Sequence, residues 1–525
     1  MGDFMLLDTI LVLLTVSVIV NILFGITVIF FEKRNPAVTW AWLVVVLLIP
    51  YIGFMLYLMI GLDARKHRTF ANKYRQNQQI LDEIKRLDLP GLYYMSEQGR
   101  AAGLAAFDSL PEAAQIGDLM RLNANSGGGY LTRHNEVTVL AEGAKKFAAL
   151  LADIRAANSF IHMQYYIFRD DALGREIIAA LALKAKEGVE VKLLIDGIGN
   201  VRNSKKLYWP LIEAGGEVGF FFPPRFIRIN YRNHRKLCII DGVCGYIGGF
   251  NIGDEYLGKV KRFGFWRDLH IRVTGTAVAE MELNFVLDWN FVCPGRMGEQ
   301  FAGRTTSPGR MGEQFAKRTT SPASPITAED KYFPAITPTQ TRGNTLMQIV
   351  ASGPDAKWPS IYHGYCKMIS ESNKSIYMIT PYFAPDDNIF ETLKIAALSG
   401  IDVRIIIPAH PDHPFVLWCS LSYLGELVRA GVKCYKYKKG FIHSKLLLID
   451  DMAASVGTTN MDIRSFKLNF EINAFIYDRN VCGQLKEIFM MDLEDCEELT
   501  TETYAARPVA HKIKEAVSRL LSPLL

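Results

Sequence analysis

The sequence lacks the patterns of metal and nucleotide chemistry. None of its ten histidines stands in an H-x-x-x-H or H-E-x-x-H arrangement, and its eight cysteines include no C-x-x-C pair. It also has no G-x-x-x-x-G-K-S/T loop to hold a nucleoside triphosphate. These absences argue against a metal site and against a nucleotide-driven kinase or ATPase. We therefore expect no metal and no cofactor, and cysteines that are buried and reduced.

The chain carries little net charge for its size. Its 525 residues have a formal charge of only +5, so the field of the whole molecule favours no particular charged partner. We expect no nucleic-acid partner, and the sequence indicates no obligatory protein partner. The length exceeds what one compact core usually accommodates, which predicts two domains or one large pseudo-symmetric unit.

Charge is missing altogether from two N-terminal runs. Residues 9–31 contain no charged side chain, and neither do residues 37–61. Each run is longer than the ~20 residues that a membrane-spanning helix requires. A cleaved signal peptide does not fit, because the first run lacks a basic leader and a small-residue cleavage site. Residues 1–62 therefore predict a transmembrane hairpin, followed by a membrane-proximal segment over residues 63–125.

The basic residues around these runs predict the orientation of the hairpin. The loop between the runs holds Lys33 and Arg34, whereas five basic residues follow shortly after the second run, at positions 65, 66, 68, 73 and 75. Basic residues concentrate on the cytoplasmic side of a membrane. We expect the remainder of the chain to lie on that side.

The rest of the chain passes twice through the same order of elements. An apolar run that ends in two aspartates is typical of a strand leading into a capped helix, and a glycine before a β-branched run is typical of the next strand. These segments are residues 159–171 and 188–196 in the first pass, and 375–387 and 400–408 in the second. We predict an α/β fold in which residues 126–292 and 346–507 form two pseudo-symmetric βαβ halves.

Three segments allow more than one interpretation. Residues 294–307 recur almost unchanged as 308–321, which predicts a flexible linker over residues 293–345 rather than a partner-binding segment. The aromatic and basic run 220–228 either packs on its own domain or meets a membrane surface. The amphipathic tail, residues 508–525, either docks on the domain or lies on the membrane.

One short pattern occurs once in each half. It reads H-x-K-x4-D, with an asparagine 17 positions after the histidine. Its members are His234, Lys236, Asp241 and Asn251 in the first half, and His443, Lys445, Asp450 and Asn460 in the second. Two copies with the same spacing supply two imidazoles and two ammonium groups as one candidate catalytic set.

Such a set fits phosphodiester chemistry without a metal. A neutral imidazole can attack phosphorus to give a phosphohistidine, and a protonated second imidazole can donate a proton to the leaving alkoxide. Lys236 and Lys445 can hold the non-bridging oxygens, with further hydrogen bonds from Asn251 and Asn460. Residues at positions i and i+2 of a strand share a face, so His and Lys can meet one phosphate.

An imidazole in this role needs a carboxylate to orient its other nitrogen. The strand predicted after each motif offers one, Asp268 in the first half and Glu471 in the second. We prefer these acids to Asp241 and Asp450, which lie five positions beyond the lysines and hence on the opposite strand face. The two motif aspartates either complete the catalytic pattern or close a structural turn.

The combination of motifs resembles the phospholipase D superfamily and, within it, the bacterial cardiolipin synthases over nearly the whole length. The matching segments are Lys-Arg-Asn-Pro-Ala between the two apolar runs, Gln-Tyr-Tyr-Ile-Phe (164–168), Asn-His-Arg-Lys (233–236), Gly-Gly-Phe-Asn-Ile-Gly-Asp-Glu-Tyr (248–256), Phe-Trp-Arg-Asp (265–268), Ser-Gly-Pro-Asp (352–355), Thr-Pro-Tyr-Phe (380–383) and Asn-Met-Asp-Ile-Arg-Ser-Phe (460–466). Residues 294–321 depart from the family pattern, which concerns the linker and not the site.

The resemblance implies a phosphatidyltransferase of the bacterial inner membrane, acting on phosphatidylglycerol and releasing cardiolipin and glycerol. The intermediate would be a phosphatidyl-histidine on His234, with His443 as proton donor and then base, although pseudo-symmetry leaves the assignment of the two histidines open. A membrane-anchored phospholipase D or phosphodiesterase that uses water needs the same residues and stays an alternative. A non-catalytic lipid-binding scaffold is a second alternative, but it would not require the complete set of two histidines and two lysines.

Overall fold

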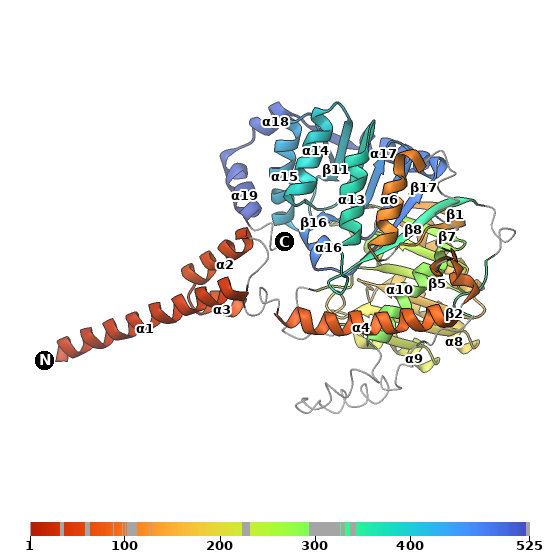
Figure 1. Cartoon of the computed structure of the whole chain (residues 1–525), viewed down its shortest axis with the longest axis horizontal. Helices are drawn as coiled ribbons and strands as arrows, with labels where there is room; N and C mark the ends of the chain where they lie inside the picture. The colour runs from red at the N-terminus through yellow and green to blue at the C-terminus, as the bar shows by residue number, and fades with distance from the viewer. Residues whose placement is uncertain are drawn as a thin grey trace. The chain divides into compact units, whose positions relative to one another are not determined.

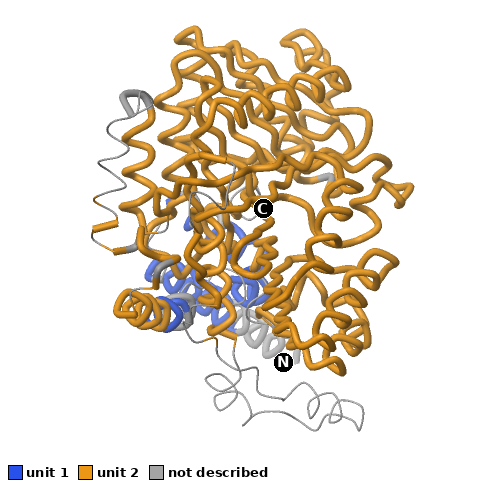
Figure 2. The backbone as a smooth tube through the Cα atoms, turned by 90° about the vertical axis from the view of Figure 1, so that its right-hand side faces the viewer, with its two compact units in different colours: residues 1–75, 224–231 blue, residues 76–223, 232–525 orange. Residues whose placement is uncertain are grey.

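The computed structural model describes residues 2–31, 36–57, 64–87, 89–96, 98–99, 101, 113–127, 129–222, 231–292, 326, 331–336 and 343–520. The chain divides into two compact units, residues 1–75 with 224–231, and residues 76–223 with 232–525 (Figure 2). The first unit contains α1 (Gly2–Phe31), α2 (Pro36–Leu48) and α3 (Ile52–Leu56), and α4 (Ala64–Leu87) begins in it.

The sequence predicts that the second apolar run forms one helix, but the structure divides it into two. Helix α2 ends at Leu48, and α3 starts at Ile52. Pro50 and Tyr51 lie between them, and Tyr51 has a φ of 63°, a value outside the helical region. Proline cannot donate a backbone hydrogen bond and its ring clashes with the preceding turn, so the helix breaks at this position.

The three N-terminal helices nevertheless pack on one another. The rings of Phe24 and Phe54 stack with their centroids 3.9 Å apart, and the Tyr51 hydroxyl donates to Ser17 Oγ at 2.8 Å. These contacts hold α1 against α3 and the turn before it. Across the part of the chain that the structure describes, no helix combines the length and the apolar character needed to cross a membrane.

Both predicted halves lie in the second unit and contribute to one sheet of sixteen strands (Figure 1). The first half comprises β1 (Thr132–Glu142), α7 (Gly143–Ala156), β2 (Phe160–Tyr165), α8 (Ala172–Lys186), β3 (Glu190–Asp196), α9 (Trp209–Glu213), β4 (Glu217–Phe221), β5 (Lys236–Ile240), β6 (Cys244–Gly248), β7 (Phe265–Thr274) and α10 (Ala277–Val292). Short 3-10 helices occur at η2 (Pro90–Met95), η3 (Lys205–Tyr208) and η5 (Asp254–Leu257).

The second half repeats this series with additions. It comprises β8 (Thr345–Ser352), α13 (Ser360–Glu371), β9 (Ser375–Ile379), β10 (Phe383–Ala384), α14 (Asp387–Leu398), β11 (Asp402–Pro408), α15 (Pro414–Arg429), β12 (Lys433–Tyr437), β13 (Gly440–Ile442), β14 (Leu446–Ile449), β15 (Ala453–Gly457), β16 (Met461–Asp462), α16 (Ile463–Lys467), β17 (Glu471–Tyr477), α17 (Arg479–Glu494), β18 (Cys496–Leu499), α18 (Thr501–Ala505) and α19 (Val509–Leu520).

The two halves have the same strand order. It is β1-β7-β6-β5-β2-β3-β4 in the first half and β8-β17-β15-β14-β9-β11-β12 in the second, and the two series meet where β1 pairs antiparallel with β8. In each half the last three strands of the series are parallel and the others antiparallel. The duplication predicted from the sequence is therefore present as two copies of one topology.

Helices cover both faces of the sheet, as the alternation along β2 shows. Ile161 and Met163 belong to the hydrophobic core shared with α7 and α8, whereas His162 points to the opposite face and contacts Glu282 of α10. Successive side chains of a strand point to opposite faces, so β2 is buried on both sides. The predicted helix caps are also present: Asp171 accepts the N–H of Gly174 at the start of α8.

Helix α6 (Ala113–Asn125) lies in the segment that the sequence assigns to the membrane surface, yet it packs into the second half. Leu119 and Met120 are buried in the core of that half, and the Asn123 amide donates to the Tyr477 hydroxyl at 3.1 Å. The apolar face of α6 thus serves the globular core. The tandem repeat 294–321 and residues 223–228 of the aromatic run lie outside the described residues.

Candidate active site

The segment before each motif histidine crosses to the other half of the molecule. Strand β13, just before His443, pairs in parallel with the start of β7, and the His443 N–H donates to the Arg267 carbonyl at 2.7 Å. In the other half, the His234 N–H donates to the Phe470 carbonyl at 2.9 Å. The sequence suggests that each histidine lies on the same strand as its lysine. In the structure, the histidines instead precede β5 and β14.

This crossing pairs each imidazole with the acid of the opposite half. His443 Nδ1 lies 2.7 Å from Asp268 Oδ2, and His234 Nδ1 lies 3.0 Å from Glu471 Oε2. Both acids are fully buried. Because Nδ1 faces the carboxylate in each case, Nε2 is the nitrogen that can meet a substrate phosphorus or its leaving oxygen.

Further buried groups hold the two acids in place. The Thr458 hydroxyl donates to Glu471 Oε2 at 2.6 Å and the Asn469 amide to Oε1 at 3.2 Å. Asp268 Oδ1 accepts the N–H of Leu269 at 2.8 Å, and a Cβ at Gly249 would lie only 2.0 Å from that oxygen. The Gly-Gly pair thus leaves room for the carboxylate, and the acids sit in fixed orientations.

The two motif lysines lie against the backbone of their own histidines. Lys236 Nζ donates to the His234 carbonyl at 2.6 Å, and Lys445 Nζ donates to the His443 carbonyl and lies 2.9 Å from His443 Nδ1. Burial lowers the pKa of Lys236 to about 7 and that of Lys445 to about 8, although nearby carboxylates oppose the effect. An anion that enters the site would therefore raise the pKa of both lysines and favour their charged forms.

Burial lowers the pKa of both imidazoles, that of His443 to well below its usual value, but the acids beside them differ. Burial lowers the pKa of His234 to about 4 despite the opposing influence of Glu471. Burial would raise the pKa of Glu471, but the adjacent His234 and Lys236 lower it below its usual value. In contrast, burial raises the pKa of Asp268 to about 7. Near neutral pH, His234 is neutral beside an ionised acid, whereas the pair of His443 and Asp268 can carry a proton.

The structure does not bring Asp241 and Asp450 to the imidazoles. Asp241 accepts the backbone N–H groups of residues 158, 159 and 160 at 2.7–2.9 Å, and Asp450 accepts those of residues 373, 374 and 375 at 2.8 Å. Both have positive φ, at 54° and 53°. Each closes the turn after its strand and fixes the start of the neighbouring strand, which is the structural interpretation that the sequence left open.

The motif asparagines are buried beside the site. Asn251 Oδ1 accepts the N–H of Ile167 at 3.1 Å, and its Nδ2 donates to the Tyr256 hydroxyl at 3.0 Å. Asn460 directly precedes β16, and its side-chain oxygen has no hydrogen-bond partner within the described residues. Asn251 thus connects the loops around its half of the site. The sequence predicts a hydrogen bond from this residue to phosphate, but not these contacts.

Sequence reasoning missed a buried network behind His234. Asp288 of α10 accepts hydrogen bonds from Arg235 at 2.7 Å, from Gln164 at 2.7 Å and from Asn233 at 3.1 Å. It therefore fixes both residues that flank the histidine. The available signal was the presence of three acids, Glu280, Glu282 and Asp288, in the mainly apolar helix 277–292, because a buried acid requires partners.

An aromatic wall next to the site was also missed. The Tyr166 ring lies edge-on to the His234 ring with centroids 5.0 Å apart, and Lys236 Nζ lies 5.4 Å from the centre of the Tyr166 ring. Trp266 takes a comparable position 5.5 Å from the His443 ring. These rings pack against the two imidazoles, which are buried, and limit their rotation.

Comparisons with known proteins agree with this geometry. The family model described as cardiolipin synthase, PLD-like domain, matches residues 150–262 and 365–493, and that of the phospholipase D-nuclease N-terminal region matches residues 13–61. The chain is 44% identical to the major cardiolipin synthase ClsA of Bacillus subtilis, covering 98% of this chain and 99% of that protein. It is 42% identical to a cardiolipin synthase of Staphylococcus aureus, covering 97% and 95%.

Among solved structures, phosphatidylserine synthase of Haemophilus influenzae superimposes with a TM-score of 0.55 at 15% identity, covering 78% of this chain and 97% of that one. This likeness shows a shared fold. The similarity to the curated relatives extends over nearly the full length of both chains, and the residues matched by the family model include both motifs. The chain therefore belongs to the cardiolipin synthases of the phospholipase D superfamily.

Proposed function

We propose that this phosphatidyltransferase joins two phosphatidylglycerols to give cardiolipin and glycerol. His234 Nε2 attacks the phosphorus of the first lipid, the bond from phosphorus to the glycerol oxygen breaks, and His443 donates a proton to that oxygen. His443 then takes the proton from the terminal hydroxyl of the second phosphatidylglycerol. The resulting alkoxide attacks phosphorus and releases His234.

The charge states around the two imidazoles carry this assignment. A nucleophile must be neutral, and His234 is neutral at physiological pH because burial lowers its pKa to about 4. A general acid needs a proton. Because burial lowers the pKa of His443 well below its usual value, the proton of this pair rests on Asp268, whose pKa burial raises to about 7. The two acids therefore distinguish halves that are otherwise alike in topology.

The lysines stabilise the transition state in this proposal. Lys236 and Lys445 are fully buried. The positive charge of each lowers the pKa of His234, so both ammoniums act on the same imidazole. An entering phosphate supplies the negative charge that favours their protonated forms. Both ammoniums can then hold the non-bridging oxygens as charge builds on the pentacoordinate phosphorus.

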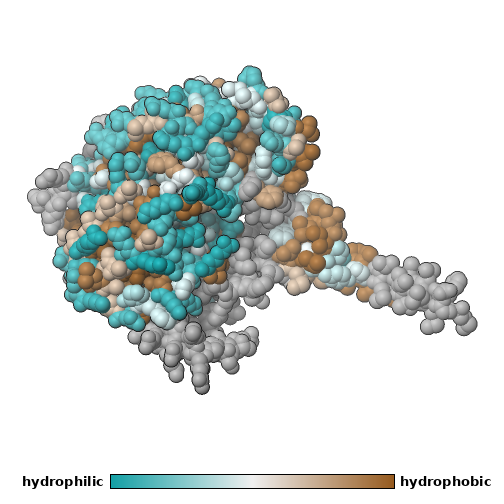
Figure 3. All heavy atoms as spheres, turned by 180° about the vertical axis from the view of Figure 1, so that it is seen from behind, coloured by the Kyte–Doolittle hydropathy of each residue, from teal (hydrophilic) through white to brown (hydrophobic). Residues whose placement is uncertain are grey.

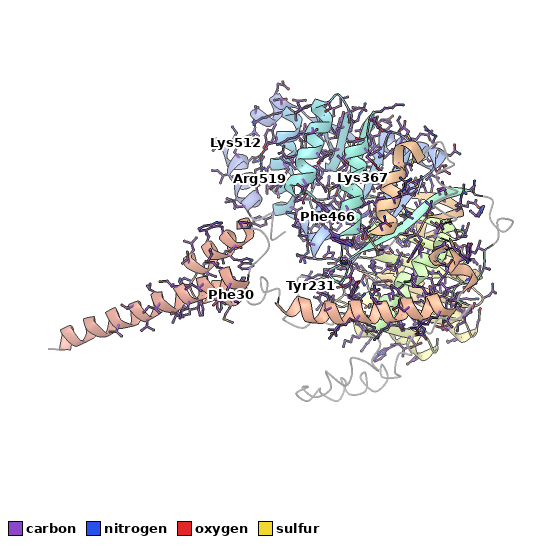
Figure 4. All side chains as sticks on the ribbon, viewed as in Figure 1. Phe30, Tyr231, Lys367, Phe466, Lys512 and Arg519 are labelled. Carbon is purple, nitrogen blue, oxygen red and sulfur yellow. The ribbon has the colours of Figure 1, made fainter. Side chains whose placement is uncertain are left out.

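The N-terminal helices are proposed as the membrane anchor of the enzyme. Residues 9–31 and 37–61 contain no charge, and apolar side chains of α1 such as Ile26 are exposed. Phe30, at the end of the same helix, is exposed as well (Figure 4). The excess of basic residues after position 61 supports a cytoplasmic catalytic unit. If the enzyme is an integral membrane protein, alkaline carbonate washing leaves the full chain in the membrane pellet, and its release into the supernatant would contradict the anchor.

Purified enzyme supplied with phosphatidylglycerol labelled in its headgroup glycerol and in its acyl chains tests the reaction. We expect labelled free glycerol and labelled cardiolipin in equal amounts. Phosphatidic acid as the only lipid product would identify a hydrolase instead. A His234→Ala variant tests the mechanism, because full transferase activity without this imidazole is incompatible with a phosphatidyl-histidine at that position.

A further inference from the structure

Helix α19 is docked on the globular unit through its polar face. Glu515 and Ser518 are its buried residues. Glu515 accepts hydrogen bonds from the Tyr504 hydroxyl and from Arg507 Nε, both at 3.0 Å. The His511 ring lies 4.7 Å from that of Trp418 on α15. The side that an amphipathic helix usually exposes to water is therefore the side that holds this helix in place.

The apolar face of the same helix is exposed to solvent. Val509, Ile513, Val517 and Leu520 are 70%, 59%, 48% and 76% exposed, and their spacing places them on one stripe of the helix. Hydrophobic residues gather at this edge of the globular unit (Figure 3). Single exposed apolar residues are common on protein surfaces, but a continuous stripe on one helix marks an interaction surface.

Basic residues border this stripe. Lys512 and Lys514 are both exposed, and Lys514 Nζ lies 5.1 Å from the centre of the Trp418 ring. Arg519 is turned toward the domain, where it pairs with Glu426 and lies 4.6 Å from the centre of the Tyr423 ring. Lys512 and Arg519 both project from this helix (Figure 4). The helix thus presents an apolar strip between two lysines, and its acid is buried away from that strip.

We infer that α19 lies in the interface of an anionic bilayer, with Val509, Ile513, Val517 and Leu520 inserted at the level of the headgroups. Apolar burial with flanking lysines is the chemistry by which amphipathic helices bind anionic membranes. The docking of its polar face fixes the helix rigidly to α15, so that membrane contact orients the catalytic unit. A protein partner would not require lysines on both borders of the strip.

Membrane contact by α19 requires neither the N-terminal anchor nor a particular phosphatidyl acceptor at the active site. A full-length Ile513→Cys variant carrying an environment-sensitive fluorophore tests it after reconstitution into vesicles with brominated acyl chains. One set of vesicles contains phosphatidylglycerol with phosphatidylcholine, the other phosphatidylcholine alone. The matched control is Leu183→Cys, a leucine of α8 that is 54% exposed. The enzyme without an added cysteine gives the labelling background.

We expect a blue-shifted, bromine-quenched emission from position 513 on phosphatidylglycerol vesicles, and a weaker effect on phosphatidylcholine alone. Position 183 should give an aqueous spectrum on both. An unquenched, blue-shifted probe at position 513 would indicate a protein contact and overturn the inference, as would a spectrum equal to that of position 183. Equal quenching on both vesicle types would overturn the preference for anionic lipid.

A pair of charge substitutions adds a functional measurement. The double variant Ile513→Glu with Val517→Glu should lose most of its activity on vesicles and keep it in mixed detergent micelles, where no bilayer has to be approached. Leu183→Glu should behave like the unsubstituted enzyme in both. Unchanged vesicle activity of the double variant would contradict a role of α19 at the membrane. Since the probe measurement needs no turnover, it stands even if the enzyme proves to be a hydrolase.

Discussion

The carboxylate of Asp268 lies 2.7 Å from Nδ1 of His443, although 175 positions of sequence separate the two residues. Asp268 belongs to the first half and His443 to the second, and Glu471 and His234 mirror this arrangement. Each half thus carries an imidazole without its orienting acid. The active site exists only when the two halves are joined in the observed register.

Replacing either carboxyl group with an amide should impair the chemical step. We expect Asp268→Asn or Glu471→Gln to lower kcat on the order of 10²-fold or more, since the imidazole loses its fixed orientation and the partner of its positive form. Steady-state glycerol release measures the effect. Glu282→Gln is the matched control, because Glu282 is a buried acid that contacts His162 at 2.7 Å away from the site. Equal losses in all three variants would indicate a defect of folding rather than of catalysis.

The activity should depend on pH with two limbs. His234, with a pKa of about 4, becomes protonated and loses its nucleophilic form as the pH falls through that value. Asp268, with a pKa of about 7, ceases to hold a proton for the His443 side as the pH rises through 7, and Lys236 loses its charge over the same range. The kcat/KM for glycerol release should therefore be greatest between these limits. An activity that increases steadily from pH 7 to 9 would contradict these charge assignments.

Asp241 and Asp450 should matter for stability and not for catalysis. Each accepts three backbone N–H groups, and their loss in Asp241→Ala or Asp450→Ala should cost about 2–4 kcal/mol. Thermal denaturation measures the loss, and the specific activity of the folded fraction should stay within about twofold of the parent enzyme. Asp118→Ala, at an exposed position, is the control and should change stability by no more than about 0.5 kcal/mol. A large fall in kcat with unchanged stability would restore a catalytic role for the motif aspartates.

The tandem repeat predicts that one of its copies is dispensable. Deletion of residues 308–321 shortens the predicted linker by one repeat and leaves the other in place, and the cost of closing a loop changes only slowly with its length. We expect unchanged transferase activity and an unchanged melting temperature. Loss of activity that is restored by an unrelated linker of equal length would show that length matters. Loss that only the native sequence restores would show a specific role for the repeat.

The sequence predicts the elements of this fold well because their local signals are strong. The paired aspartates mark the starts of α8 and α14, and alternation of apolar residues along the chain identifies the strands. The equal order of elements in both halves follows from the duplicated motifs. Helix α6 could not be assigned to the second half, because its amphipathic pattern shows that one face is buried but not which surface covers it.

The composition of the site was predictable, but its pairing was not. Two imidazoles, two lysines and two acids follow from the repeated motifs and from the chemistry of phosphodiesters. That each acid serves the histidine of the opposite half depends on the pairing of β13 with β7 and on the bridge between Asn233 and Phe470, long-range registers that no local pattern encodes. Asp288 was missed for the same reason, since Gln164 on one side and Asn233 and Arg235 on the other come from two segments far from it in the sequence.

The crossed register also has a consequence for biosynthesis. A ribosome releases the first half before the second, and that half then holds His234 with no carboxylate behind it. A chain that ends before the second half therefore has an incomplete active site, because Glu471, His443 and Lys445 are missing from it. His234 gains its orienting carboxylate only after β17, which begins at Glu471, has been synthesised and has joined the sheet.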